Sequence, residues 1–201
     1  MRIRPIRRSG CAERGFTLFE ALISIALAAI AAAALLLGLM SSNQTTEFGY
    51  EQAIALGIAE QLANEIVGKR YVGRLEDPYG TSLGASVIEE NGNRIEYDDI
   101  DDFDQFTAKP PQSPMKMTLG EDDGEGQLRH PNFRLAPPNF DQWREYVEVY
   151  FVSDSDPATR LSAGQTSSLK AVEVHVFKKV GDGVEKELAN VRRVIGYIPS
   201  P

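Results

Sequence analysis

The chain has 201 residues, which is room for one domain or for one domain with a long appendage, and its 42% hydrophobic and 25% charged residues suit a globular core. Its formal net charge of −8 is unevenly spread: residues 1–15 hold five arginines and one acid, whereas residues 16–201 hold 16 Lys and Arg against 28 Asp and Glu. Phosphate backbones would repel the acidic body, which argues against a nucleic-acid partner. The single cysteine, Cys11, cannot form a disulfide within the chain.

Residues 16–40 form an apolar stretch with one formal charge, Glu20. A helix needs about 20 apolar residues to cross the hydrocarbon core, whereas the apolar core of a removed signal peptide has only about 7–15. We therefore expect a retained, single-pass transmembrane helix, with a removed signal peptide as the alternative. Short basic flanks stay in the cytoplasm, so residues 1–15 are expected inside and the acidic body outside.

Glu20 is the unusual residue of this stretch. A carboxylate within an apolar helix costs on the order of 2.5–3.5 kcal/mol on insertion scales, and such residues are functional candidates by default. The alternative is that Glu20 lies near the cytoplasmic interface, where its side chain reaches water.

Residues 14–20 read Arg-Gly-Phe-Thr-Leu-Phe-Glu. Together with the basic leader and the apolar run, this string resembles the cleavage and methylation signal of type IV prepilins and type II secretion pseudopilins of bacteria. The resemblance implies that prepilin peptidase cuts between Gly15 and Phe16 and that Phe16 is N-methylated. It also implies that Glu20 is the assembly carboxylate, paired with the Phe16 amine of a neighbouring subunit. Phe19 departs from the pattern, where leucine or isoleucine is commoner.

Apolar residues recur at helical spacing between Glu47 and Arg70, which predicts that the helix continues from Phe16 to about Lys69. Residues 41–70 would then be a soluble continuation of the membrane segment. The segment resembles the same region of minor pilins of the PilV and MshD kinds. The face expected in the core consists of Ala55, Ile58, Ala59, Leu62 and Ile66.

The pattern of residues 71–201 predicts a β-rich head with long loops. The expected fold class is therefore α+β, with a long N-terminal transmembrane helix packed on a small antiparallel sheet. The resemblance to pilins implies the same arrangement. Asn91-Gly92 favours a tight turn between two strands of a hairpin. Strands are expected at residues 86–90, 94–97, 115–119, 145–152, 169–180 and 184–198, the last broken by a bulge or bend, with a turn at 181–183.

An acidic run follows the predicted hairpin and contains Asp98, Asp99, Asp101, Asp102 and Asp104. Carboxylate oxygens of this kind are ligands for calcium. The spacing lacks the glycine and glutamate of an EF-hand loop, so the alternatives are a solvated loop and a calcium site. The run also resembles a string found in MshD-like minor pilins.

The sequence predicts neither catalysis nor a cofactor. The histidines, His130 and His175, lie in a loop-like and a strand-like segment, and neither a Walker glycine loop nor a Gly-x-Ser-x-Gly motif is present. The function expected is a minor structural subunit of a type IV pilus, with prepilin peptidase, other pilin subunits and the inner membrane as partners. The alternatives are a type II secretion pseudopilin of the GspI kind and a signal-anchored periplasmic binding domain that does not polymerise.

Overall fold

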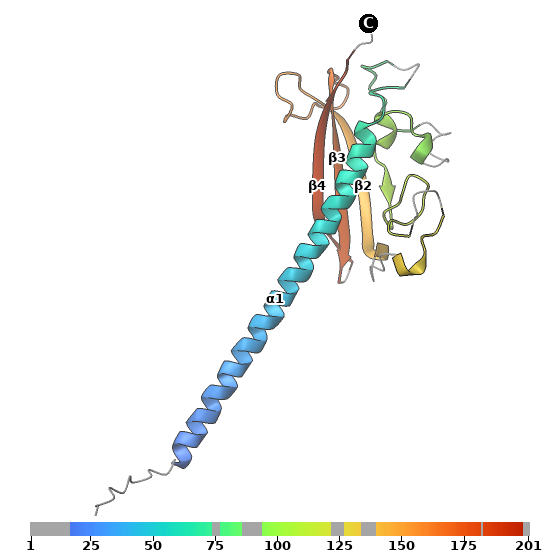
Figure 1. Ribbon diagram of the computed structural model, residues 1–201. Coiled ribbons are helices and arrows are strands. Elements are labelled where there is room, and N and C mark those ends of the chain that lie inside the picture. The colour runs from blue at the N-terminus through green and yellow to red at the C-terminus, as the bar shows by residue number, and fades with distance from the viewer. Residues whose placement is uncertain are drawn as a thin grey trace, which may run out of the picture. The chain divides into compact units, whose positions relative to one another are not determined.

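The computed structural model describes residues 17–73, 77–85, 94–121, 127–133, 140–181 and 183–198. The chain divides into two compact units, which meet between Phe48 and Gly49. The first unit contains the apolar part of helix α1 (Leu18–Val67), and the second contains the end of α1 and the head (Figure 1). The predicted cleavage junction, Gly15–Phe16, lies outside the described residues.

Helix α1 is a continuous element of 50 residues, close to the predicted span of 16–69. Gly38 and Gly49 lie within it without interrupting it, because summed propensity outweighs a cost of about 1 kcal/mol for each glycine. The helix ends at Val67, and the N–H of the following Gly68 donates to the carbonyl of Asn64 at 3.2 Å. Its first part is long and apolar enough to cross a membrane.

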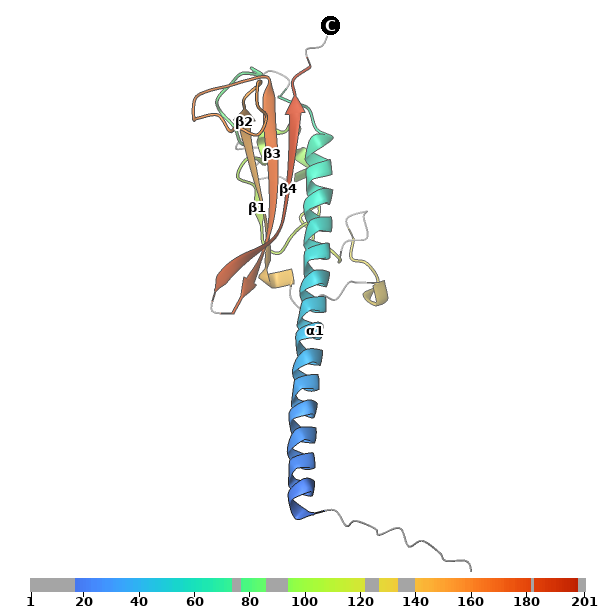
Figure 2. The same cartoon turned by 90° about the vertical axis from the view of Figure 1, so that its left-hand side faces the viewer.

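The head is built on a four-stranded antiparallel sheet in the order β1-β2-β3-β4 (Figure 2). The strands are β1 (Thr107–Ala108), β2 (Trp143–Val152), β3 (Leu169–Val180) and β4 (Val184–Gly196). The prediction of three strands at 145–152, 169–180 and 184–198 is therefore confirmed to within two residues. The irregularity expected in the last strand is also present, since the pairing of β3 with β4 shifts between Val176 and Phe177.

The core lies between the end of α1 and one face of the sheet, and both views show this part of the helix running alongside the sheet (Figures 1 and 2). All five residues of the predicted helix face are buried, together with Ala63. Alternate valines of β2 and β3 supply the opposite surface, each worth about 1.5–3 kcal/mol on burial. These are Val147, Val149, Val172, Val174 and Val176.

Two predicted strands are corrected. Residues 94–96 form a short 3-10 helix, η1 (Arg94–Glu96), and residues 86–93 lie outside the described part of the chain, so the expected second hairpin strand at 94–97 is wrong. The physical reason is that Arg94 is drawn into a buried ion cluster with α1 and β2. At 115–119 the structure has only an isolated bridge between Gln112 and Thr118, because Lys116 adopts a left-handed conformation there.

Candidate assembly site at the start of the apolar helix

Thr17 and Glu20 form a reciprocal capping arrangement at the first turn of α1. The Glu20 carboxylate accepts hydrogen bonds at Oε2 from the backbone N–H of Thr17 (3.1 Å) and from its hydroxyl (2.9 Å). The Thr17 hydroxyl oxygen in turn accepts from the Glu20 N–H at 3.3 Å. Such a box satisfies two backbone N–H groups that a helix start otherwise leaves unpaired.

This arrangement gives Glu20 a role that sequence reasoning missed. The signal was present, since Thr-x-x-Glu before an apolar run is a capping-box pattern. Both of these hydrogen bonds reach the Glu20 carboxylate at Oε2. The side chain is therefore oriented by its own helix, and no donor among the described residues contacts Oε1.

The surface of α1 beyond this turn is apolar and uncovered. Its large side chains from Leu18 to Met40 are exposed on the isolated chain, including Phe19 and Leu37. Exposed apolar surface of this extent marks contact with a membrane or with other proteins. Glu20 thus lies at the start of a segment whose surroundings must be lipid, neighbouring helices, or both.

Residues 11–36 match a family model described as the prokaryotic N-terminal methylation motif, which spans Gly15, Phe16, Thr17 and Glu20. The chain is a type IV pilin-like protein. The motif implies processing by prepilin peptidase and assembly into a pilus, and with the apolar helix it points to the inner membrane or a pilus as the location. Searches of curated proteins and of solved structures find no significant match.

The resemblance also settles the class of protein. This pilin-like chain is a structural protein and not an enzyme. Its histidines fit that assignment: His130 is exposed in a loop, and His175 on β3 is half-buried with Nδ1 2.8 Å from Oε1 of Glu187. His175 therefore belongs to a network of polar side chains on the sheet face that α1 does not cover.

The acidic run of the pilin-like head is a tightly bonded turn around the 3-10 helix η2 (Asp101–Phe103). The expectation of a solvated loop is wrong for Asp99, Asp101 and Asp102, all of which are buried. The run is drawn inward because Phe103 and Ile100 are fully buried beside it.

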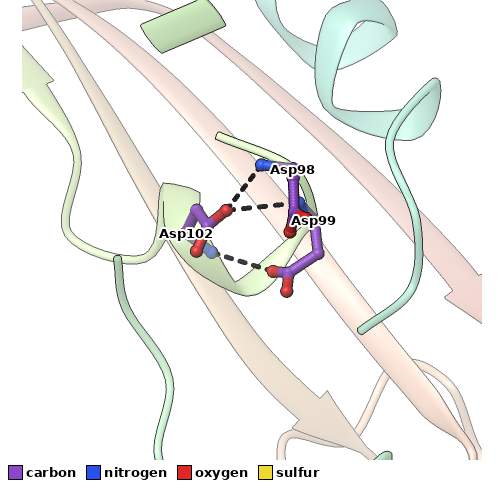
Figure 3. A group of neighbouring side chains, drawn as sticks. All are labelled: Asp98, Asp99 and Asp102. Carbon is purple, nitrogen blue, oxygen red and sulfur yellow. Dashed lines mark hydrogen bonds between the residues drawn. The ribbon is translucent and has the colours of Figure 1, made fainter. Parts of the chain in front are cut away.

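Figure 3 shows the hydrogen bonds that join Asp98, Asp99 and Asp102 in this turn. Asp102 Oδ2 accepts from the backbone N–H groups of Asp98 (2.8 Å) and Asp99 (3.2 Å), and Asp99 Oδ1 accepts from those of Asp101 (2.7 Å) and Asp102 (3.2 Å). Side-chain oxygens here replace the regular backbone partners of a turn.

The remaining aspartates of the run bond outside it. Asp98 is paired with Arg70, and Asp104 Oδ1 accepts from the Val149 N–H at 2.9 Å. Carboxylate oxygens of Asp98, Asp99 and Asp102 lie within 4.8 Å of one another, close enough for one cation. Calcium binding stays a prediction, and the turn has a structural explanation without it.

Proposed function

We propose that this pilin-like protein is a minor structural subunit of a type IV pilus. Residues 1–15 are a cytoplasmic leader that prepilin peptidase removes between Gly15 and Phe16. Phe16 is then N-methylated, residues 16–40 cross the inner membrane, residues 41–70 continue the helix, and residues 71–201 form the periplasmic head. The observation that carries the proposal is the methylation motif at the start of a long, uncovered apolar helix.

Cleavage and assembly are linked through charge. Cutting after Gly15 frees an amine on Phe16, and a lone carboxylate in an apolar filament core is costly. The Glu20 carboxylate, held at Oε2 by Thr17, presents Oε1 to the Phe16 amine of a neighbouring subunit. The pair offsets the cost of burying both charges and fixes the axial position of each subunit.

The sequence favours a minor pilin over a major pilin. Helix α1 contains no proline between Leu18 and Val67, and no cysteine follows Cys11 to brace the head. The resemblance of the helix end and the acidic run to PilV and MshD minor pilins favours a pilus. A type II secretion pseudopilin is the second candidate, because the processing motif is common to both families.

Mass spectrometry of the N-terminus of the membrane-extracted protein tests this function. The expected terminus is N-methylated Phe16, and Gly15→Val should retain the leader while the matched Gly10→Val is processed normally. An intact leader on the wild-type protein would overturn the proposal.

Assembly is tested separately from processing. Glu20→Gln should be cut but absent from sheared filaments, whereas Glu13→Gln, whose site is removed with the leader, should assemble. If Glu20→Gln assembles at the wild-type level, the assembly role is wrong. Recovery as a small fraction of sheared pili supports the minor pilin, and recovery that depends on a type II secretion system supports the pseudopilin.

A further inference from the structure

A buried cluster of three charged side chains joins the end of α1 to the sheet. Arg94 donates to Glu65 on α1 through Nε and Nη2, both at 3.0 Å, and to Glu145 on β2 through Nη1 at 3.2 Å. The side chains of Arg94 and Glu145 are 5% and 1% exposed, and that of Glu65 is 16% exposed. The cluster therefore connects three segments that are distant in sequence.

The charges of this cluster do not balance. Two carboxylates face one guanidinium, and the other close partner is the neutral backbone of Gln112, whose N–H donates to Glu145 at 3.1 Å and whose carbonyl accepts from Arg94 at 3.0 Å. The Phe106 ring lies 5.0 Å from the guanidinium carbon. Opposite Glu145 on β3 stands Val176, which carries no charge. With both carboxylates ionised, the described residues of the cluster hold one negative charge more than positive charge.

Glu145 is the group on which a proton would relieve this imbalance. Burial raises the pKa of Glu145 to about 7, with the Glu65 charge adding to the rise, while Arg94 and the Gln112 N–H oppose it. Glu65 keeps some contact with solvent, so it is the carboxylate that can leave Arg94 most easily when both are charged.

We propose that the Glu65–Arg94–Glu145 cluster is a proton-operated latch that fastens the end of α1 to the head. When Glu145 is protonated, Arg94 keeps its bidentate ion pair with Glu65, and this pair holds the end of α1 against the head. Loss of the proton makes two carboxylates compete for one guanidinium, and the last turn of α1 loosens. The latch rests on contacts between the end of α1 and the head, and it does not depend on the proposed pilus function.

The direction of the effect follows from linkage. The folded-state pKa of Glu145 lies above its ordinary value of 4.5, so the protonated form adds stability that is complete below about pH 4.5 and is lost as the pH rises through about 7. The helix end should therefore be better protected at pH 5.5 than at pH 8.5.

Hydrogen exchange on the full chain in detergent micelles tests the latch, with rates corrected for intrinsic chemistry. Amides near the end of α1 should lose protection on the order of tenfold between pH 5.5 and 8.5. Glu145→Gln should abolish this pH dependence. Glu148→Gln is the matched control, because Glu148 lies on the same strand in a partly exposed pair with Arg160 and should leave the dependence intact.

Glu65→Gln supplies a second measurement if Glu145→Gln fails to fold. Removing the Glu65 charge should lower the pKa of Glu145 and move the midpoint of the protection profile to lower pH. An unchanged profile in Glu145→Gln, or an unmoved midpoint in Glu65→Gln, would overturn the latch.

Discussion

Lys170 on β3 places its Nζ 2.6 Å from Oδ2 of Asp101, and both side chains are buried. The same ammonium donates to the carbonyl of Tyr71 at 3.3 Å and lies 4.3 Å from the centre of the Tyr71 ring. Burial and the Asp101 charge raise the pKa of the Tyr71 hydroxyl, which keeps this side chain neutral. One cation thus joins the segment after α1, the acidic turn and the sheet.

Lys170→Met should destabilise the head by about 3–5 kcal/mol, because it leaves the Asp101 charge buried without its cation. Thermal or denaturant unfolding followed by circular dichroism measures the loss. Lys179→Met, at an exposed position of the same strand, is the control and should change little. Adding Asp101→Asn to Lys170→Met should recover part of the loss, and a double variant no more stable than the single one contradicts the pairing.

Val174→Ala should cost about 2 kcal/mol, since two methyl groups leave a fully buried site between β3 and the end of α1. Val184→Ala removes the same atoms at a position that is 70% exposed and should stay within about 0.5 kcal/mol of the wild type. Urea unfolding of the two variants in parallel compares them. Equal losses at both positions would show that the packing described for the core is wrong.

Thr17→Ala should loosen the first turn of α1 by about 1 kcal/mol, a typical cost of losing an N-cap side chain. The Glu20 amide loses its hydroxyl acceptor, so its hydrogen exchange in micelles should accelerate about fivefold. Thr17→Ser keeps the hydroxyl and should exchange at nearly the wild-type rate. Identical rates for alanine and serine would mean that the capping box does not form in the membrane-mimetic state.

Asp102→Ala should destabilise the acidic turn by about 1–3 kcal/mol, because two backbone N–H groups lose their shared acceptor. We expect the loss to be the same in calcium and in chelator, since Asp102 Oδ2 and Asp99 Oδ1 each already accept two backbone N–H groups. Melting temperatures in both buffers measure it. A wild-type melting temperature that rises with calcium, and no longer does so in Asp102→Ala, would establish a calcium site instead.

Much of the fold was predictable from the spacing of apolar residues within single helices and strands. The bounds of β3 were predictable to the residue because its alternate valines face a single core, and the helix face was predictable from the spacing of residues such as Ala55 and Leu62. Each of these signals lies within one element, where side-chain period and burial coincide.

Contacts between distant segments were not predictable in the same way. Asn91-Gly92 favours a hairpin, but Arg94 is held by Glu65 and Glu145, which are 29 and 51 residues away in the sequence. The sequence around Arg94 contains no pattern that would predict such distant pairings. The burial of the acidic run was not predictable for the same reason, because Asp101 pairs with Lys170, which lies 69 residues further along the chain. The Thr17–Glu20 box was local, and its pattern was visible in the sequence.

The register shift between β3 and β4 bears on how the edge of the sheet avoids pairing with other chains. β4 is the last strand of the sheet and 13 residues long, and an edge of that length is a template for aggregation between chains. The shift bends the strand, and exposed charges at Glu185, Lys186, Glu187 and Arg193 make edge-to-edge stacking unfavourable. The head can therefore expose a long edge strand at high local concentration with little tendency to form β-aggregates.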